Sequence, residues 1–539
     1  MLKRIIAWSA THPLAVGIGT VALIIAGVWA MLNTSVDAIP DLSDAQVIVM
    51  TEWPGQAPQL VEDQVTYPLE TELLKVPNTK FVRGMSQFGL SAVYVVFEDG
   101  TDLYWARSRV LEYLNGIAGK LPPGATTTLG PDATGVGWIM QYVLADTSGT
   151  LNLAELRALQ DFTVRPALTA VPGVAEIASF GGFEKEYQVQ VDPAKLFAYG
   201  IPIQKVTDAV RASNADVGGR VLEAGGTEYV VRARGRFTSL DDIRGVSIGM
   251  GPGGTPVTVG DVAEVQVGPA IRRGIADLNG KGEVVTGWVV MRYGANPRNV
   301  IDGVKRKMTE LEGALPRGVR FVEGYDRSGL IDRAIRTLKT KLIEESIIVA
   351  LVTVIFLLHA PSALVAIVTL PIGVLMALLA MRTLGLSANI MSLGGIAIAI
   401  GAMIDAAIVM VENLHKHMER NEAAGSPKEH WTLVIESAQE VGPALFISLL
   451  IITASFLPVF ALQDQEGRLF KPLAWTKTLS MASAALLSVT LVPVAMGLFV
   501  KKGVKPEASN PVNRVLIRAY RPVIELVLRN RWPTIVVAA

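Results

Sequence analysis

The chain has 539 residues, of which 50% are hydrophobic and only 18% are charged. Such a composition is uncommon in soluble proteins and favours a membrane protein. The 49 basic and 49 acidic residues cancel, so the overall charge gives no indication of nucleic-acid binding. The absence of cysteine excludes disulfide bonds and thiolate metal sites, and it leaves methionine and histidine as the donors for soft metal ions.

Long apolar runs predict six membrane-spanning helices and the start of a seventh. The first run follows Lys3 and Arg4 and has no small-residue cleavage site, so residues 1–32 are expected to be an uncleaved anchor rather than a signal peptide. Residues 532–539 begin a seventh helix but supply only about eight of the roughly 20 residues that a crossing needs. The complete spans are expected at 13–32, 342–358, 363–382, 390–411, 441–461 and 473–500, the last five within a membrane region 340–500.

Basic residues predict the orientation of these helices. Lys3 and Arg4 place the N-terminus in the cytoplasm, because cytoplasmic segments carry an excess of Lys and Arg. The basic segments 415–420 and 501–531 fall on the same side, and the second of them is predicted to be a cytoplasmic amphipathic connector. The whole segment from 33 to 339 is then extracytoplasmic, which predicts a large domain outside the membrane.

The extracytoplasmic segment contains an internal repeat. The sequence LKVPN at 74–78 recurs as AVPGV at 170–174, and amphipathic helices are predicted before them at 58–75 and 153–170. Alternating strands follow each copy, so the order strand-helix-strand-strand-helix fits a split βαβ, ferredoxin-like module. The second copy is completed only after a glycine-rich insertion at about 182–270, which we expect to form its own subdomain.

Asp405 lies inside the run Ile390 to Val411, where every other residue is apolar or small. A carboxylate in the middle of a membrane helix costs roughly 2.5–3.5 kcal/mol, and residues tolerated at that cost usually serve a proton relay or an ion path. The alternative is a carboxylate that only hydrogen-bonds a neighbouring helix. Glu412 lies about 20° from the same helical face, but it is near the cytoplasmic edge, so we interpret it as an interfacial residue.

Five sequence motifs are distinctive: GAMIDAAIVMVEN, VGPALFISLLIIT, EGRLFKPLAWTKT, PDATGVGW and DGTDLYWARSRVLEYLN. They resemble motifs of the heavy-metal efflux branch of the resistance-nodulation-division (RND) transporters, and the resemblance covers the whole chain. It implies a proton-driven metal antiporter rather than an enzyme, without a resident cofactor. It also implies a homotrimer in the bacterial inner membrane that contacts a periplasmic adaptor (a membrane fusion protein) and an outer-membrane channel.

The same resemblance implies a fold and its division. A membrane α-helical bundle carries periplasmic α+β porter subdomains at 33–135 and at 136–181 with 271–335, and a docking subdomain at 182–270. Full-length members have two such halves, so the chain corresponds to the N-terminal half of a truncated RND fold. The carboxylate and lysine that partner Asp405 in the family, and a three-methionine periplasmic site, lie in the other half. Whether another polypeptide supplies that half stays open.

The methionines of the membrane helices suggest the transported ion. Thioethers select Cu(I) and, by the same softness, Ag(I), whereas Zn, Co and Ni favour imidazole or carboxylate. Met403 and Met410 are two helical turns apart on one face, and Asp405 is about 160–200° around the helix from them. Methionine is also ordinary packing material. With the resemblance, the residues expected to relay metal are Met391, Met403, Met410, Met481 and Met496.

Two positions bear on the choice of metal. Ile271 stands where the copper/silver type can carry a periplasmic methionine, which weakens a relay there. Ala399 stands where divalent-metal relatives carry an acidic residue, which favours a monovalent ion. The main alternative is an exporter of divalent cations (Zn, Co, Cd, Ni), and the alternative of another class is a non-transporting fragment that acts at most as an assembly or interaction module.

The remaining motifs are weak. His415 and His417 lie beside Lys416 and Arg420, and we interpret them as a solvated cytoplasmic rim rather than a metal site. The glycine cluster GMGPGG at 249–254 lacks the Lys-Ser/Thr pair that completes a phosphate-binding loop, which argues against ATP-driven transport.

Overall fold

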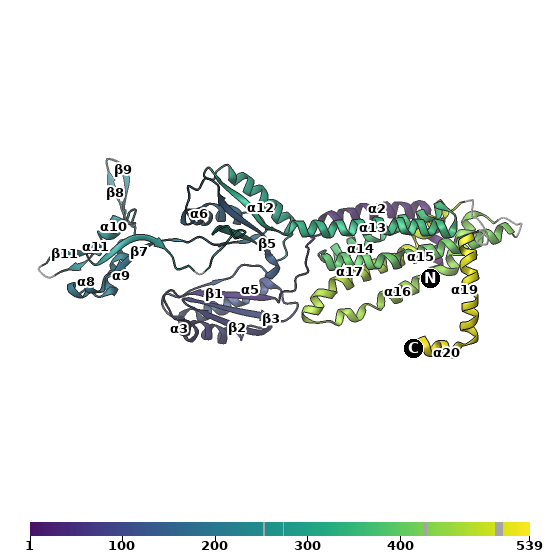
Figure 1. Cartoon of the computed structure of the whole chain (residues 1–539), viewed down its shortest axis with the longest axis horizontal. Helices are drawn as coiled ribbons and strands as arrows, with labels where there is room; N and C mark the ends of the chain where they lie inside the picture. The colour runs from purple at the N-terminus through teal and green to yellow at the C-terminus, as the bar shows by residue number, and fades with distance from the viewer. Residues whose placement is uncertain (252–253, 273, 424–427, 502–509, 539) are drawn as a thin grey trace.

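The structure is a computed structural model that describes residues 1–251, 254–272, 274–423, 428–501 and 510–538. The molecule is elongated, and Figure 1 shows three parts in a row along its long axis. A bundle of long helices forms one end, two α/β sheets lie in the middle, and a smaller subdomain with a protruding hairpin forms the other end.

The first sheet has the strand order β2-β3-β1-β4, and its paired strands are antiparallel. Its strands are β1 (Gln46–Glu52), β2 (Thr79–Gln87), β3 (Leu90–Phe97) and β4 (Thr126–Leu129). Two helical segments cover its buried face. The first consists of α3 (Pro58–Val61), η1 (Glu62–Thr66) and α4 (Tyr67–Leu73), and the second is α5 (Leu103–Ile117). This order confirms the predicted split βαβ arrangement.

The second sheet repeats that arrangement with the order β14-β5-β13-β6, again antiparallel. Its elements are β5 (Trp138–Asp146), α6 (Leu153–Leu159), η4 (Gln160–Val164), α7 (Arg165–Thr169), β6 (Val174–Phe180), β13 (Val285–Met291), α12 (Pro297–Glu312) and β14 (Val319–Asp326). Because β13 follows β6 only after about a hundred residues in the chain yet pairs with it directly, the sheet closes across an insertion.

The two copies share an irregularity that the sequence did not reveal. The first helix of each is interrupted by one π-helical turn, Glu62–Thr66 in one and Gln160–Val164 in the other. Each copy then reaches a residue with left-handed backbone, Asn78 (φ 63°) and Gly173 (φ 88°), just before its second strand. Since π-helical turns are rare, the same interruption at the same place supports the internal duplication.

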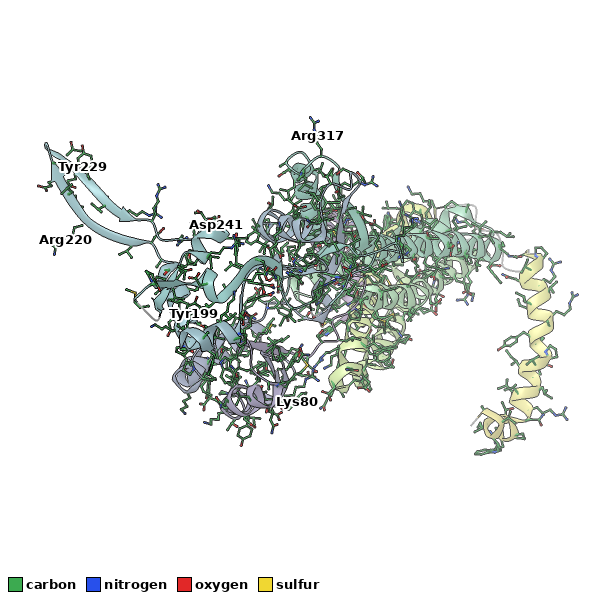
Figure 2. All side chains as sticks on the ribbon, turned by 60° about the vertical axis from the view of Figure 1, so that its left-hand side comes forward. Lys80, Tyr199, Arg220, Tyr229, Asp241 and Arg317 are labelled. Atoms are coloured by element: carbon green, nitrogen blue, oxygen red, sulfur yellow. The ribbon has the colours of Figure 1, made fainter. Side chains whose placement is uncertain are left out.

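The insertion folds around a separate core. It leaves the second sheet through β7 (Lys185–Val191) and returns through β12 (Ala263–Pro269), and these two strands pair antiparallel. A hairpin of β8 (Val217–Ala224) and β9 (Thr227–Ala233) extends from it into solvent (Figure 2). The remaining elements are α8 (Pro193–Tyr199), α9 (Ile203–Ser213), α10 (Leu240–Arg244), β10 (Ser247–Met250), β11 (Pro256–Thr258) and α11 (Val259–Val262). Residues 252–253 of the GMGPGG cluster lie outside the described part.

Among the described residues, four helices are long and apolar enough to cross a membrane. If a bent pair of helices is counted as one span, there are up to five. The pair is α17 (Asp464–Val489) and α18 (Leu491–Phe499), which meet at an angle of 52°. The four are α2 (Pro13–Asn33), α14 (Ala360–Thr383), α15 (Ile390–Ala423) and α16 (His430–Ala454), the last followed by a short turn η5 (Leu457–Ala461). The first predicted segment is split, because α1 (Leu2–Thr11) ends before Pro13.

The expected second span, 342–358, belongs to α13 (Ser328–Leu357), which is not among those four helices. Its N-terminal part is charged, follows β14 directly, and carries the chain from the second sheet into the bundle (Figure 1). Its apolar part packs along α14 and α15. One continuous helix therefore links the extramembrane part to the bundle.

Beyond the bundle, α19 (Pro511–Arg529) is the predicted amphipathic connector, and it runs across the bundle end in Figure 1. Asn510 is the N-cap residue of this helix. Its side-chain amide donates hydrogen bonds to the carbonyls of Ile355 (2.7 Å) and Phe356 (2.9 Å) at the end of α13. Residues 502–509 of the connector lie outside the described part. The expected start of a seventh helix falls in α20 (Arg531–Ala538).

Candidate functional site

The central helix of the bundle is α15, which packs against α13, α14, α16, α17 and α18. One of its faces stays uncovered. Ile398, Gly401, Asp405 and Val409 are exposed along it, and Glu412 is half-buried at its end. The spacing of three and four residues makes these positions one stripe along the helix. Asp405 lies in the middle of that stripe.

No described residue forms a hydrogen bond or an ion pair with the Asp405 carboxylate. An ionisable side chain at membrane depth is costly unless it faces a polar partner or a water-filled space. Gly394 and Gly401 lie on the same face, and a Cβ added at either would meet nothing within 4 Å. Small residues let another helix approach closely. The stripe therefore has the small residues and the open space that are typical of a helix-packing surface.

The predicted methionines lie on the buried side of α15. Met403 and Met481 belong to one buried cluster, and Met410 and Met496 belong to the larger cluster beside it. All four side chains are at most 6% exposed. Met391 is half-buried in the first turn of α15 and belongs to neither cluster. The structure thus brings four of the five residues together in two pairs, on the opposite face from Asp405.

These pairs are packed without an open channel. The methyl of Met403 fills the space over Gly373, where an added Cβ would meet it at 2.2 Å. The cavity beside Met403 and Ser488 measures only about 10 Å³, about enough for one water molecule. Next to Met481, the Ser480 hydroxyl is buried without a hydrogen-bond partner. Passage of an ion along these residues would require the helices to move.

In the helical bundle, sequence analysis missed two further buried methionines among the described residues. Met381 (1% exposed) and Met418 (7% exposed) lie in the cluster that contains Met410 and Met496. The expected span ended at residue 411, whereas α15 continues to Ala423. Met418 follows Met410 by about two helical turns, so the same periodicity would have found it in a longer helix.

The interpretation of His415 as a solvated residue was wrong. Its side chain is buried at 6% exposure, because the extended α15 packs against the start of α14. The Ser362 hydroxyl lies 2.7 Å from Nε2 of His415 and 2.8 Å from Nδ1 of His359. His417 is more exposed and pairs through Nε2 with Glu440 at 2.6 Å. A buried polar cluster therefore occupies this end of the bundle.

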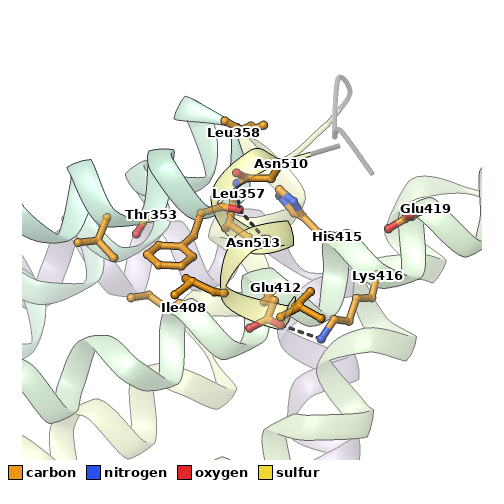
Figure 3. Close-up of a pocket in the computed structure, with 14 residues that line it drawn as sticks. Thr353, Leu357, Leu358, Ile408, Glu412, His415, Lys416, Glu419, Asn510 and Asn513 are labelled. Carbon is orange, nitrogen blue, oxygen red and sulfur yellow. Dashed lines mark hydrogen bonds and ion pairs between the residues drawn. The ribbon is translucent and has the colours of Figure 1, made fainter. Parts of the chain in front are cut away.

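A cavity of about 410 Å³ opens beside that cluster, between α13, α15 and the first turns of α19 (Figure 3). Its walls are mostly apolar, and Glu412, His415, Lys416 and Glu419 contribute polar groups. Glu412 pairs with Lys416 at 2.7 Å, and both side chains are about half-exposed. Glu412, at the end of the Asp405 stripe, places a charged group of this cavity about two helical turns from Asp405.

Two arginines join the bundle to the extramembrane part. Arg327, at the start of α13, is 5% exposed and contacts the Asp37 carboxylate at 3.3 Å. Burial raises the pKa of Asp37 although the nearby guanidinium opposes that shift. Arg468, in α17, bonds Asp44 and Asp99 in the region of the first sheet. Both sheets are thus tied to the bundle through buried or half-buried charged groups.

Ile271, the position at which a periplasmic methionine was considered, is 74% exposed. It lines a cavity of about 460 Å³ together with Arg157, Phe180 and Arg272. No described lining residue there is a methionine.

Comparison with known proteins assigns this arrangement to a family. The sequence model of the AcrB/AcrD/AcrF family matches residues 5–539. The chain belongs to the AcrB/AcrD/AcrF family. Among its family relatives, the cation efflux system protein CusA of Escherichia coli is 55% identical over 546 residues, which cover 100% of this chain and 52% of that protein. The cobalt-zinc-cadmium resistance protein CzcA of Cupriavidus metallidurans is 35% identical over 553 residues, covering 100% and 51%.

Solved structures of the family agree with this fold. Two crystal forms of a heavy metal efflux pump superpose with TM-scores of 0.84 and 0.80, at 31% and 32% sequence identity. The matches cover 99% and 92% of this chain and 51% and 48% of the pump. The RND transporter fold is therefore confirmed, and the chain spans about half the length of the relatives it matches.

Proposed function

We propose that this chain, together with the complementary half that its relatives carry, exports Cu(I) or Ag(I) by proton antiport. The observation that carries the proposal is the division of α15 into two faces. Met403 and Met410 face inward toward Met481 and Met496, and Asp405 lies on the uncovered face. Metal and protons would then use opposite sides of one helix.

The uncovered face supports the role of Asp405 as a proton acceptor. A second helix packed on Gly394 and Gly401 would bring its side chains beside the Asp405 carboxylate. A basic partner there would hold the charged carboxylate, and protonation would release that interaction. Proton binding and release at Asp405 would thereby change how the two halves pack.

The choice of metal is supported by the donors. Thioethers favour Cu(I) and Ag(I) over harder divalent ions. Ala399 is fully buried in the cluster of Met403 and Met481 and offers no charge to a divalent ion. The higher identity to CusA than to CzcA points the same way. Export of divalent cations is the second candidate, favoured by the relatives named for cobalt, zinc and cadmium.

The exposed hairpin supports assembly into a homotrimer. Every residue of β8 is exposed, and apolar side chains such as Val221, Leu222, Tyr229 and Val230 face solvent on the hairpin. An isolated two-stranded hairpin is only marginally stable in water, so a neighbouring protomer would stabilise it. We place the trimer in the inner membrane with its N-terminus in the cytoplasm, in contact with a periplasmic adaptor and an outer-membrane channel.

Transport in reconstituted vesicles tests the proposal. The chain and its complementary half are inserted into proteoliposomes, a pH gradient is imposed, and Ag(I) and Zn(II) fluxes are compared. We expect Ag(I) flux that collapses when a protonophore removes the gradient. A Zn(II) flux larger than the Ag(I) flux would favour export of divalent cations. A flux that the protonophore does not change would exclude proton antiport.

A further inference from the structure

Two buried imidazoles at the α19 end of the bundle have no part in the proposed methionine path. His359 occupies the N-cap position of α14 and His415 lies on α15, and their side chains are 7% and 6% exposed. Their ring centroids are 5.4 Å apart and the ring planes are inclined by 73°. Both contact the same atom, Oγ of Ser362, at 2.8 and 2.7 Å. Two ring nitrogens from different helices therefore converge on one point.

We propose that His359 and His415 form a loading site for Cu(I) or Ag(I), bound between Nδ1 of His359 and Nε2 of His415. This deepens the proposed function and rests on it for the identity of the cation. Imidazole nitrogen is a good donor for copper, and monovalent d¹⁰ cations accept two donors in a near-linear arrangement. A structural zinc site needs four ligands, and no group of three or more His, Cys, Asp or Glu among the described residues is placed to hold a metal.

The cavity beside His415 supplies access. It measures about 410 Å³, and Figure 3 shows His415 on its wall near Asn510. Among the described lining residues, Glu412 and Glu419 carry carboxylates and Lys416 carries an ammonium group. An excess of acidic groups around a concave surface raises the local concentration of cations. In the proposed orientation the cavity faces the cytoplasm, where the exported cation must be collected.

Thioethers continue from the imidazoles into the bundle. Met418 is one helical turn beyond His415 on α15, and Met410 is between one and two turns before it. Both are buried in the cluster that contains Met496. The Ser362 hydroxyl lies between the two imidazole nitrogens, so a bridging cation would displace it by rotation about χ1. A cation released from the nitrogens would then meet soft sulfur donors on the way to Met403.

Silver binding to the purified chain in detergent tests the site without any transport assay. Ag(I) is titrated against a competing chelator, and X-ray absorption at the silver edge identifies the ligand atoms. We expect a nitrogen-coordinated silver ion in the wild type. His359→Gln and His415→Gln should each remove about one equivalent and the nitrogen signal, because glutamine keeps a hydrogen-bonding group near Ser362 but not the imidazole donor.

Two variants serve as controls. His417→Gln removes an imidazole two residues away that pairs with Glu440, and it should leave binding unchanged. Ser362→Ala removes the shared hydroxyl but keeps both imidazoles, so binding should persist or strengthen. Helical circular dichroism and monodisperse elution establish that each variant is folded, and the wild-type absorption spectrum decides the question even where a histidine variant does not fold.

Three results would overturn the inference. They are a wild-type spectrum without nitrogen ligands, unchanged binding in both histidine variants, and loss of binding in folded Ser362→Ala. Each of these results would mean that the two histidines and Ser362 form a hydrogen-bond network and not a metal site. Failure of the proposed function is separate. If the transport path does not use the methionines, replacing them by Leu leaves export intact. X-ray absorption on the purified chain still shows whether silver is bound by nitrogen, whatever the result of that export assay. The methionines are Met403, Met410, Met481 and Met496.

Discussion

The guanidinium of Arg468 bonds the carboxylate of Asp44 at 2.8 Å and so joins α17 of the membrane bundle to the segment that leads into the first sheet. The same guanidinium bonds Asp99, which lowers the pKa of that carboxyl, and it donates to the carbonyl of Leu42. Because α17 packs along α15, a shift of the helix that carries Asp405 can reach the first sheet through this contact.

Replacing Arg468 by Ala should weaken the contact between the membrane bundle and the first sheet. The side chain is 17% exposed, and its removal leaves the Asp44 and Asp99 carboxylates without this partner. Since both carboxylates are half-exposed and water can replace part of the contact, we expect a loss on the order of 1–2 kcal/mol. Thermal unfolding in detergent measures it. Arg521→Ala, at a side chain that is 79% exposed, is the matched control, and an equal loss in both variants would contradict the prediction.

The turn at Asp146 should make the second sheet sensitive to acid. Hydrogen bonds from the Ser148 hydroxyl and the Leu151 amide lower the pKa of Asp146 to about 2. The folded-state pKa is below the unfolded value of about 3.9, so the stabilisation is present above about pH 4 and is lost as the pH falls toward 2. Asp146→Asn should therefore flatten the rise in melting temperature between pH 2 and 5. An unchanged pH profile would show that this carboxylate contributes nothing, and Asp241→Asn, at an exposed position, is the control.

Asp405→Asn should abolish export in the complete pump while leaving folding and assembly intact. Asparagine nearly preserves the shape of the side chain but cannot exchange a proton in the required range, so only the titrating group is lost. Proton-coupled metal flux into reconstituted vesicles is the measurement, and we expect it to fall to the level of protein-free vesicles. Wild-type flux in Asp405→Asn would exclude this residue as the relay.

Replacing the four buried methionines by Leu should separate transport from packing. Leucine keeps volume and apolarity nearly constant and usually costs less than about 1.5 kcal/mol per site, so the protein should stay folded. It offers no lone pair to a soft cation, so Cu(I) and Ag(I) export should fall sharply. Equal export by the variant would assign these side chains to packing. The residues are Met403, Met410, Met481 and Met496.

Expressed by itself, the chain should not transport. The carboxylate of Asp405 faces outward without a partner among the described residues, and the proposed mechanism requires one on a facing helix. In a metal-sensitive, pump-deleted host, the chain alone should leave tolerance to copper and silver unchanged, whereas co-expression with the complementary half should raise it. Tolerance restored by the chain alone would contradict the proposed role of the uncovered face.

Sequence periodicity predicted the elements that repeat regularly. The two split βαβ copies were visible because apolar residues recur with the period of a strand or a helix, and local turn residues mark their ends. The π-helical turns in Glu62–Thr66 and Gln160–Val164 were not visible, because one extra residue in a helical turn hardly disturbs the apolar pattern.

Helix ends were predicted less well. The apolar run stops at Val411, but α15 continues for three more turns as an amphipathic helix to Ala423. That extension buries His415 and Met418, which hydropathy alone assigns to a solvated rim. Conversely, the apolar run of α13 is short, because its charged first half lies outside the bundle and belongs to the same continuous helix.

Residue spacing alone identifies Asp405 as an isolated carboxylate in an apolar helix and puts Met403 and Met410 on the other side of that helix, because helical geometry depends only on spacing. Which of these two faces is buried depends on how the other helices pack. Packing of α17 and α18 against α15 encloses the methionines and leaves Asp405 exposed. The fold also brought His359 close to His415, which lies 56 positions further along the chain, a proximity that no spacing within one helix encodes.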